Sequence, residues 1–340
     1  MSTKDVVSTK WRELVIKYQQ PSTKAAVTQI LTTFIPLVAG LVLMALAMKV
    51  HYGLVLLLAI PTGGLLVRIF IVMHDCGHGS FFRSRRLNDI FGFITGCMTF
   101  TPYIQWRRDH AVHHASSGNL EKRGVGDIAT LTVKEYEALS RWGRFKYRIY
   151  RNPLILLVFG PVWLVIKHRL PTPGVHTTKK EKLNVWLTNA TLVAVGIVLA
   201  MFGVLGEAAA IYLPAFLVAG SAGVWLFYVQ HQFEDTYWRP AAEWDYATSA
   251  LKGSSYLKLP RVLQWFSGNI GLHHVHHLSP RIPNYRLQQA HDEQPELQNV
   301  PTISFWEGLK ALRLRLWDEE NMRLIGFREF RERQAALRSN

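Results

Sequence analysis

The chain contains four long apolar segments, and these constrain its fold more than any other feature. The hydrocarbon core of a membrane is about 30 Å thick, so a helix needs about 20 apolar residues to cross it. Four segments reach that length, although Arg68 interrupts the second of them: residues 28–48, 52–73, 185–205 and 208–229. We therefore predict an all-α integral membrane protein with four transmembrane helices.

The spacing of these segments predicts two hairpins. About three residues, 51–53, separate the first two segments, and residues 206–207 separate the last two. The rest of the chain must then lie on one side of the membrane, where residues 74–183 and 230–340 are expected to form a helical cap that holds the functional site. We interpret the whole chain, residues 1–340, as a single domain.

Two shorter apolar segments and the N-terminal segment lie outside the four predicted spans. Residues 90–104 and 153–166 are apolar but short, which favours an interfacial or re-entrant position, although a six-span arrangement stays open. Residues 1–20 lack the apolar core and small-residue cleavage site of a signal peptide. We expect them to form an amphipathic helix on the cap side.

Positive charge is concentrated on the cap side of the predicted spans. All but two of the 39 lysines and arginines fall there, and the formal net charge is +15. By the positive-inside rule, the cap side is the cytoplasm. Because the charges lie next to spans, anionic lipid headgroups are the expected partners rather than nucleic acid, and an acidic electron-transfer protein could use the same face.

Three short clusters close to the predicted spans contain nine of the 14 histidines, and eight of these nine are candidate ligands. The first has the form HDCGH, and the other two, HAVHH and HHVHH, both have histidines at offsets of zero, three and four. Such residues share one face of a helix, so each cluster can aim its imidazoles at one point. A ninth candidate, His231, follows the fourth span. We predict a metal site formed by His74, His78, His110, His113, His114, His231, His273, His276 and His277.

Residues beside these histidines are candidates for supporting roles. No cluster contains the Glu-x-x-His pair of carboxylate-bridged di-iron sites, and imidazole alone suits zinc, copper, iron and nickel alike. Asp75, Asp109 and Glu234 are expected to orient ligand imidazoles by accepting a hydrogen bond from the far ring nitrogen. Asn269, four residues before His273, is a candidate for holding a metal-bound water.

The other histidines are interpreted as structural. His274 points about 100° away from its neighbour His273 on a helix, which favours a packing role or a place behind the ligands. His51, His168, His176 and His291 lie outside the clusters. Isolated histidines of this kind are usually surface or interface residues.

Four segments resemble the integral-membrane fatty acid desaturase family, and together they contain all nine candidate ligands. They are HDCGHGSFF, WRRDHAVHH, FYVQHQFED and GNIGLHHVHHLSPRIPNY. Their order and their position relative to four spans are also similar, over about residues 25–300. The HDCGH form of the first cluster is similar to that of acyl-lipid desaturases of the Δ12 or ω6 type, although Δ5 and Δ9 relatives have similar clusters.

The resemblance implies a metal and a reaction. The nine histidines would bind two iron ions, and molecular oxygen would be the co-substrate for placing a cis double bond in a membrane lipid acyl chain. An unactivated methylene has no acidic proton and no leaving group, so this step requires oxidation at a metal. No G-x-G-x-x-G fingerprint is present, and we therefore expect a separate electron donor, ferredoxin or a b-type cytochrome.

The acyl chain is expected to lie in an apolar tunnel between the spans and the cap. Aromatic residues close in sequence to the ligands could line it, or could simply pack in the core: Trp106, Trp225, Tyr228 and Trp265. Arg107 and Arg108 could hold a headgroup phosphate. The expected location is a bacterial inner membrane, with both termini and the active site in the cytoplasm.

Other classes of function stay open at this point. A fatty acyl or carotenoid hydroxylase would use the same scaffold and ligands, and only its product would differ. A metal transporter would need polar ligands near mid-membrane, whereas here the histidines lie beyond one end of spans that contain few ionisable residues. The pattern therefore favours an oxygen-dependent enzyme at one membrane face.

Overall fold

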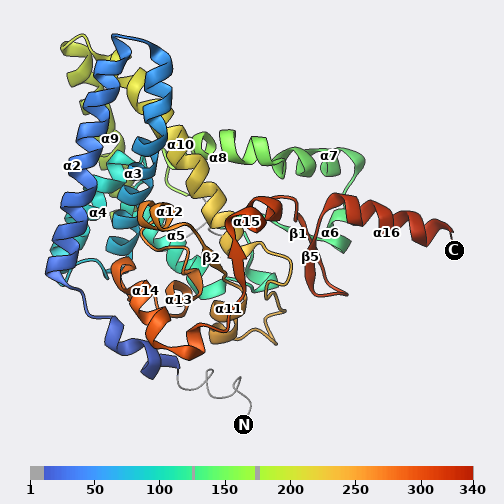
Figure 1. Cartoon of the computed structure of the whole chain (residues 1–340). Coiled ribbons are helices and arrows are strands. Elements are labelled where there is room, and N and C mark those ends of the chain that lie inside the picture. The colour runs from blue at the N-terminus through green and yellow to red at the C-terminus, as the bar shows by residue number, and fades with distance from the viewer. Residues whose placement is uncertain (1–10, 125–126, 173–176, 340) are drawn as a thin grey trace.

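The computed structural model describes residues 11–124, 127–172 and 177–339. Four helices in this part of the chain are long and apolar enough to cross a membrane, and they form the tall bundle in Figure 1. They are α2 (Thr23–Met48), α3 (Tyr52–His78), α9 (Lys179–Met201) and α10 (Leu205–His231). The predicted helical fold with four spanning candidates is confirmed.

Both predicted hairpins are present, but the second turn lies earlier than expected. Residues 49–51 join α2 to α3, and residues 202–204 join α9 to α10. Gly203 has φ +71° in the second turn, a left-handed conformation that glycine adopts without steric cost. The residues expected to form that turn, 206–207, are instead in the first turn of α10.

The start of α9 also differs from the expected boundary at residue 185. The helix begins at Lys179, because Thr178 and Glu181 form a capping box that satisfies the first free backbone N–H groups. The charged first turn is therefore helical although it is not apolar. Hydropathy alone marks where a helix can meet lipid, and the capping residues mark where it begins.

Helix α3 is the centre of the bundle. Of its apolar window, 61% is buried, compared with 17% for α2, 17% for α9 and 28% for α10. Leu66 and Ile69 of α3 pack in one core cluster with Leu37 of α2 and Ala215 of α10. Because α3 carries the first two candidate ligands at its end, this packing fixes the direction from which they enter the site.

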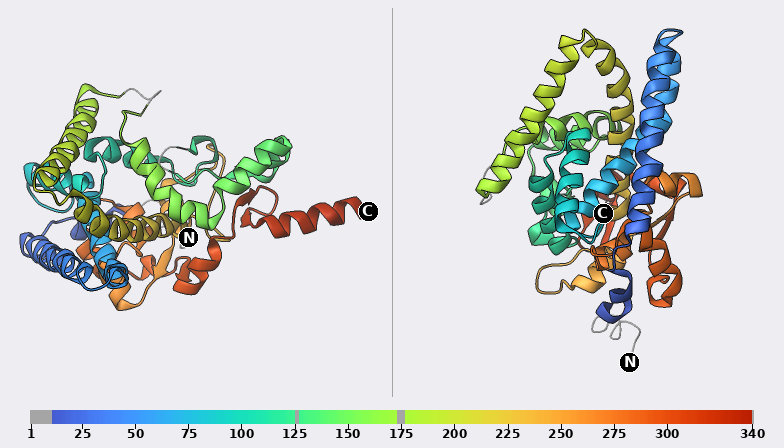
Figure 2. Two further views of the ribbon diagram at one scale, coloured as in Figure 1. Left: turned by 90° about the horizontal axis from the view of Figure 1, so that it is seen from above. Right: turned by 90° about the vertical axis from the view of Figure 1, so that its left-hand side faces the viewer.

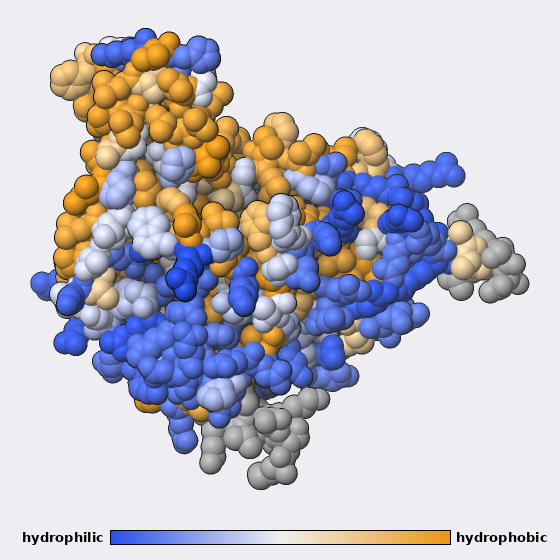
Figure 3. Space-filling view, viewed as in Figure 1, coloured by the Kyte–Doolittle hydropathy of each residue, from blue (hydrophilic) through white to orange (hydrophobic). Residues whose placement is uncertain are grey.

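The outer faces of the bundle are apolar. Leu31, Val42, Val193 and Ile197 are exposed, and Figure 3 shows a nearly continuous hydrophobic surface on the tall part of the molecule, with hydrophilic side chains gathered below it. Exposed apolar surface of this extent is stable in lipid rather than in water. The protein is therefore a membrane protein.

The remaining elements form the cap, which we define as the described residues outside the four spanning helices and the two hairpin turns that join them. Most of its elements are short helices, and Figure 1 shows α5 and α11–α15 at the lower end of the bundle. The helices are η1 (Ile16–Tyr18), α4 (Arg85–Met98), α5 (Tyr103–Ser116), η2 (Leu120–Lys122), α6 (Val133–Ala138), α7 (Arg141–Tyr150), η3 (Ile155–Phe159), α8 (Gly160–Lys167), α11 (Tyr246–Lys252), α12 (Arg261–Phe266), α13 (His273–Leu278), α14 (Asn284–Glu293), η4 (Pro295–Leu297), α15 (Phe305–Ala311) and α16 (Phe327–Ser339).

Five short strands add a feature that hydropathy did not indicate. They form a three-stranded sheet in the order β1-β4-β5 and a parallel pair, β2-β3. The strands are β1 (Leu131–Thr132), β2 (Tyr256–Lys258), β3 (Thr302–Ser304), β4 (Leu316–Asp318) and β5 (Arg323–Ile325). Each strand has only two or three residues, so the sheets fasten loops of the cap and leave the helical architecture unchanged.

The two short apolar stretches do not form two further spans. Residues 90–104 are divided between α4 and α5, and α4 packs along α3. Residues 153–166 belong mainly to η3 and α8, which together with α7 form a pair bent by 64°. This pair extends sideways from the bundle in Figure 1, and the view from above in Figure 2 shows it to one side of the spanning helices. Among the described residues there are four spanning candidates, or five if the bent pair is one span, so the six-span arrangement is not supported.

Candidate metal centre

The nine histidines chosen from the sequence come together at the cap end of the bundle. They are contributed by four helices: the end of α3, the second half of α5, the last residue of α10 and the short α13. They form two groups, and within each group one ring nitrogen of every residue lies within 4.8 Å of the others. Group one is His74, His78, His110, His114 and His276, and group two is His113, His231, His273 and His277.

The division into two groups corrects one expectation from the spacing. Each cluster was expected to aim its imidazoles at a single point, but α5 and α13 lie between the groups and serve both. His110 and His114 of α5 face group one, while His113 faces group two. On α13, His276 faces group one, while His273 and His277 face group two. The offset of three or four residues spreads side chains widely enough on a helix to reach two adjacent points.

Distances between ring nitrogens match those expected around a metal ion. Two nitrogens bound at right angles to one ion, each about 2.1 Å from it, lie about 3.0 Å apart. The Nε2–Nε2 distances are 3.0 Å for His74–His110, 3.0 Å for His110–His114, 3.0 Å for His114–His276, 3.1 Å for His113–His231 and 2.9 Å for His231–His273. Each group therefore has the spacing of a coordination shell.

Unpartnered nitrogens and protonation state also fit a metal. Nε2 of His78 and Nε2 of His277 are buried and have no hydrogen-bond partner among the described residues. Burial lowers the pKa of five histidines outside the spans well below 6.5, and the neighbouring histidines lower it further; they are His110, His114, His273, His276 and His277. A neutral imidazole keeps the lone pair with which it binds a metal. The residues present could thus hold two metal ions.

Comparisons with known proteins identify the family of this chain. The family model for fatty acid desaturases matches residues 50–306, a range that includes all nine histidines. A protein named fatty acid desaturase from Bacillus subtilis is 45% identical over 98% of this chain and 96% of its own length. The chain belongs to the fatty acid desaturase family. This desaturase is accordingly an oxidoreductase of lipid metabolism.

More distant relatives carry more specific names. A Synechocystis protein named sn-1 oleoyl-lipid 12-desaturase is 29% identical to this chain. The aligned region covers 69% of this chain and 66% of the Synechocystis protein. The spinach chloroplastic omega-6 fatty acid desaturase is 27% identical to this chain. The aligned region covers 69% of this chain and 52% of the spinach protein. The resemblance to desaturases of the Δ12 or ω6 type that the sequence suggested is confirmed at this level.

Asp75 contacts a histidine of group one, as its predicted supporting role requires. Its Oδ1 lies 2.9 Å from Nδ1 of His74, so this ring can donate N–H to the carboxylate and turn its other nitrogen toward the group. Oδ2 of Asp75 accepts hydrogen bonds from the backbone N–H and the side-chain amide of Asn284, at 2.6 Å and 2.8 Å. The carboxylate is buried. It therefore joins the end of α3 to α14 while it orients a histidine.

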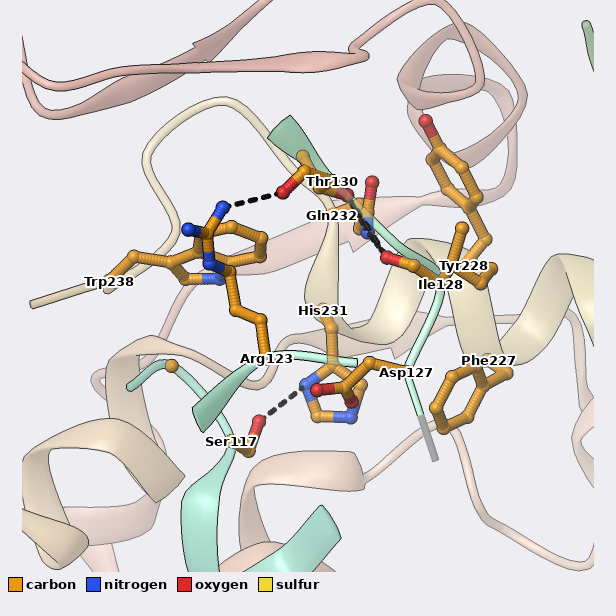
Figure 4. A pocket seen from close by; sticks show the side chains of 11 residues that line it. Ser117, Arg123, Asp127, Ile128, Thr130, Phe227, Tyr228, His231, Gln232 and Trp238 are labelled. Carbon is orange, nitrogen blue, oxygen red and sulfur yellow. Dashed lines mark hydrogen bonds between the residues drawn. The ribbon is translucent and has the colours of Figure 1, made fainter. Parts of the chain in front are cut away.

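Asp127 has the matching position in group two, although no motif or spacing in the chain indicated it. Its Oδ1 lies 2.5 Å from Nδ1 of His113. Figure 4 shows Asp127 beside the ring of His231, with Ser117 on the other side. Nδ1 of His231 is 3.3 Å from Oγ of Ser117 and 3.2 Å from the carbonyl oxygen of Gly253. Asp127 lies in a loop after α5, outside every cluster, so only the tertiary fold reveals its role.

Two other acidic residues do not have the predicted supporting role. Asp109 forms an ion pair with Arg108, and Glu234 forms one with Arg323. In both cases an arginine competes successfully for the carboxylate because it offers a full charge and several N–H groups. These acids therefore pair with cations rather than with ligand imidazoles.

Asn269 lies outside the helix on which its prediction was based. The helix α13 begins at His273, and Asn269 has a left-handed backbone with φ +60°. Its side-chain amide donates to the backbone oxygen of Asn284 at 3.2 Å. Asn269 therefore does not share a helical face with His273. Its role in holding a metal-bound water stays a prediction.

The remaining histidines of the described residues lie elsewhere. His274 belongs to neither group, and its Nε2 is 3.2 Å from Nδ1 of His291. His51 caps the start of α3 by accepting a hydrogen bond from Gly53, and His168 follows the end of α8. His176 lies outside the described residues.

The aromatic and arginine candidates are divided between several environments. Trp106 stacks on His110 with a ring-centroid distance of 4.4 Å, so it covers one side of group one. Tyr228 lines the narrow hollow in Figure 4. Trp225 donates to the backbone oxygen of Gly308, and Trp265 packs against Arg68. The acyl tunnel stays a prediction for these residues.

The two arginines proposed to hold a headgroup are both engaged by carboxylates. Arg108 pairs with Glu181 as well as with Asp109, and it is largely buried. Arg107 donates to Asp89 at 3.2 Å and lies over the ring of Tyr103. Arg107 also lines a surface groove beside His78. Of the pair, Arg107 is therefore the one that faces an open surface.

Proposed function

We propose that this desaturase uses molecular oxygen to place a cis double bond in the acyl chain of a membrane lipid, at two iron ions held by the nine histidines. The observation that carries the proposal is the pair of adjacent groups made only of imidazoles, with five and four members. Two such groups side by side provide two metal positions. The family to which the chain belongs gives them an oxidative role.

Iron is proposed because the reaction requires a redox-active metal. Imidazole also binds zinc, but zinc has no redox chemistry and cannot remove hydrogen atoms from a methylene. Two bound irons would supply the reduction of oxygen and the oxidation of the acyl chain. The overall reaction consumes one oxygen molecule, two electrons, two protons and two adjacent hydrogen atoms of the acyl chain, and it yields the double bond and two water molecules.

The residues of the chain position the reactants and keep water out. The imidazoles hold the two metal positions, while Asp75 and Asp127 fix ring orientation through His74 and His113. Trp106 shields His110. Because a methylene has no functional group to recognise, the carbon that reacts is chosen by placement alone.

The proposed substrate is an acyl chain that is already part of a membrane lipid. The bundle presents an apolar surface to the bilayer, so an acyl chain can reach the site without entering water. Two relatives are named as an oleoyl-lipid 12-desaturase and an omega-6 desaturase. We assign the same mid-chain region of the substrate to this enzyme.

We further propose that the site faces the cytoplasm of a bacterium, with the protein in the inner membrane. Support comes from the concentration of lysine and arginine on the cap side. The two electrons would come from a separate carrier, a ferredoxin or a b-type cytochrome, since the sequence contains no nucleotide-binding fingerprint. This orientation places the histidine groups where such a carrier is present.

Expression in a bacterium that lacks polyunsaturated lipids tests the proposal. Gas chromatography of the fatty acids is expected to show a new double bond in cells that make the desaturase together with an electron donor. The variant His276→Ala removes an imidazole from group one and should abolish the product. His168→Ala is the matched control, because His168 lies outside both groups.

The product also separates desaturation from hydroxylation, which the same site could support. A hydroxylated acyl chain in place of the double bond would assign the protein to the hydroxylases. An unchanged fatty acid profile, with a working donor and a suitable acyl lipid present, would contradict the proposal.

A further inference from the structure

A basic groove opens on the surface beside group one. Its volume is about 310 Å³. The residues that matter for its chemistry are His78, Arg83, Arg85, Asp89 and Arg107, which come from the end of α3, the loop that follows, α4 and α5. The groove therefore connects the solvent directly with one of the proposed metal ligands.

The groove reaches the less protected of the two groups. His78 is only partly buried, whereas all four members of group two are buried. The hollow beside group two in Figure 4 has a volume of about 20 Å³, and its arginine, Arg123, is paired with Glu135 at 2.7 Å. Group one is thus the group that a large partner can approach closely.

The charge of the groove is positive and partly unpaired. Arg107 is paired with Asp89 at 3.2 Å, but three arginines face this single acid among the lining residues. Arg83 and Arg85 are exposed, and Nε of Arg83 donates to the backbone oxygen of Pro21. Such a surface attracts an acidic partner and speeds its approach.

The loop that carries Arg83 is held in place. Asn88 is buried, its Oδ1 accepts from the backbone N–H of Phe82 at 3.0 Å, and its amide donates to the backbone oxygen of Phe82 at 2.8 Å. Because Arg83 follows Phe82 directly, its position relative to α4 is fixed before any partner arrives. A preorganised surface loses less entropy on binding.

We propose that this groove is the docking site of an acidic one-electron carrier protein, which passes electrons to group one past the edge of His78. The inference rests on the proposed function, since it is desaturation that requires two electrons per double bond. Two reduced carriers dock in succession, each gives one electron and leaves oxidised. The electrons are used in the reduction of oxygen to water.

A phospholipid headgroup fits the groove less well, although arginines also bind phosphate. The groove ends at His78, so a headgroup there would bring the first carbons of its acyl chain to the metals. The proposed reaction takes place near the middle of the chain. The position of the groove therefore favours the electron carrier over the substrate headgroup.

Binding of an acidic [2Fe–2S] ferredoxin to the full-length protein in detergent tests the proposal without relying on activity. The double variant Arg83→Glu/Arg85→Glu should weaken binding of the oxidised ferredoxin roughly tenfold at low salt, with a smaller difference at high salt. Arg331→Glu reverses an exposed charge on α16, which lies far from α3, α4 and α5 in Figure 1. This variant should bind like the wild type. Equal weakening in both variants, or none in the double variant, would overturn the proposal.

Dithionite as an alternative reductant separates docking from the chemistry. The ratio of ferredoxin-driven to dithionite-driven desaturation should fall roughly tenfold in the double variant. If both rates fall by the same factor and the KM for acyl lipid rises, the arginines bind the substrate headgroup and the carrier proposal is overturned. If wild-type protein forms no double bond with either reductant, the proposed function fails, while the binding experiment still decides whether the groove binds the carrier.

Discussion

The two histidine groups contain the same kind of donor but differ in their surroundings. Group one has five imidazoles, one of which, His78, is partly buried, and it lies beside an open basic groove. Group two has four imidazoles, all buried, and lies beside a narrow hollow. A carboxylate orients one histidine in each, Asp75 in group one and Asp127 in group two. Similar ligand sets thus have different access to solvent, and we expect the groups to respond differently to substitution.

The largest effect is expected for His231→Ala in group two. Nε2 of His231 is close to both His113 and His273, so its loss leaves three imidazoles without their central neighbour. Iron should fall from two ions to about one per chain. Desaturation should fall by more than roughly 100-fold, the upper end of effects for residues that only support a ligand. Elemental analysis and gas chromatography measure both, and retention of two irons would contradict the assignment.

Asp127→Asn should selectively weaken group two. The amide keeps the size of the carboxylate but loses the charge that holds His113 through a 2.5 Å contact. We expect the affinity of group two for Fe(II) to fall about 10- to 100-fold, with group one unaffected. Titration of Fe(II) into the metal-free protein measures this. Asp235→Asn, at an exposed aspartate, is the control, and equal loss at both groups would show that Asp127 has a general structural role.

Asp75→Asn should affect group one less strongly and also lower the stability of the protein. Its carboxylate divides its hydrogen bonds between His74 and Asn284, so we expect a loss of Fe(II) affinity nearer tenfold. Loss of a buried charged acceptor should lower the free energy of unfolding by about 1–3 kcal/mol. The same titration and a thermal melt measure the two effects. An unchanged affinity of group one for Fe(II) would show that Asp75 does not orient His74 for metal binding.

The smallest effect is expected for Gly79→Ala at the end of α3. Gly79 has φ +69°, and a Cβ there would contact nothing within 4 Å, so the cost comes from the backbone conformation alone. We expect about 1–2 kcal/mol of destabilisation, and less for Gly79→Asn, because asparagine tolerates this conformation better. Thermal melts of the two variants measure the difference. Equal melting temperatures for both variants and the wild type would show that α3 can end in another way.

The candidate ligands could be found from sequence because their spacing is local. Offsets of three and four residues mark one helical face, and the apolar segments mark the depth at which those faces lie. His231 belongs to no cluster but follows the fourth span directly, so the same argument of depth places it near the others. The histidines thus share one end of the bundle for reasons that are visible in the chain itself.

The division into two groups could not be found in the same way. Whether His113 faces the same metal position as its neighbour His114 depends on how α5 crosses α3, α10 and α13, which is a tertiary property. Asp127 lies in a loop with no helical offset to guide a prediction. Asp109 and Glu234 were predicted to support ligands because they are close in sequence, but nearby arginines bind them instead.

Iron content and lipid product, measured on the same preparation, test the central claim most directly. The wild-type protein, expressed in iron-replete medium with an electron donor, should contain two iron ions per chain, and the host lipids should contain a new cis double bond. Zinc in place of iron together with an unchanged fatty acid profile would contradict the account.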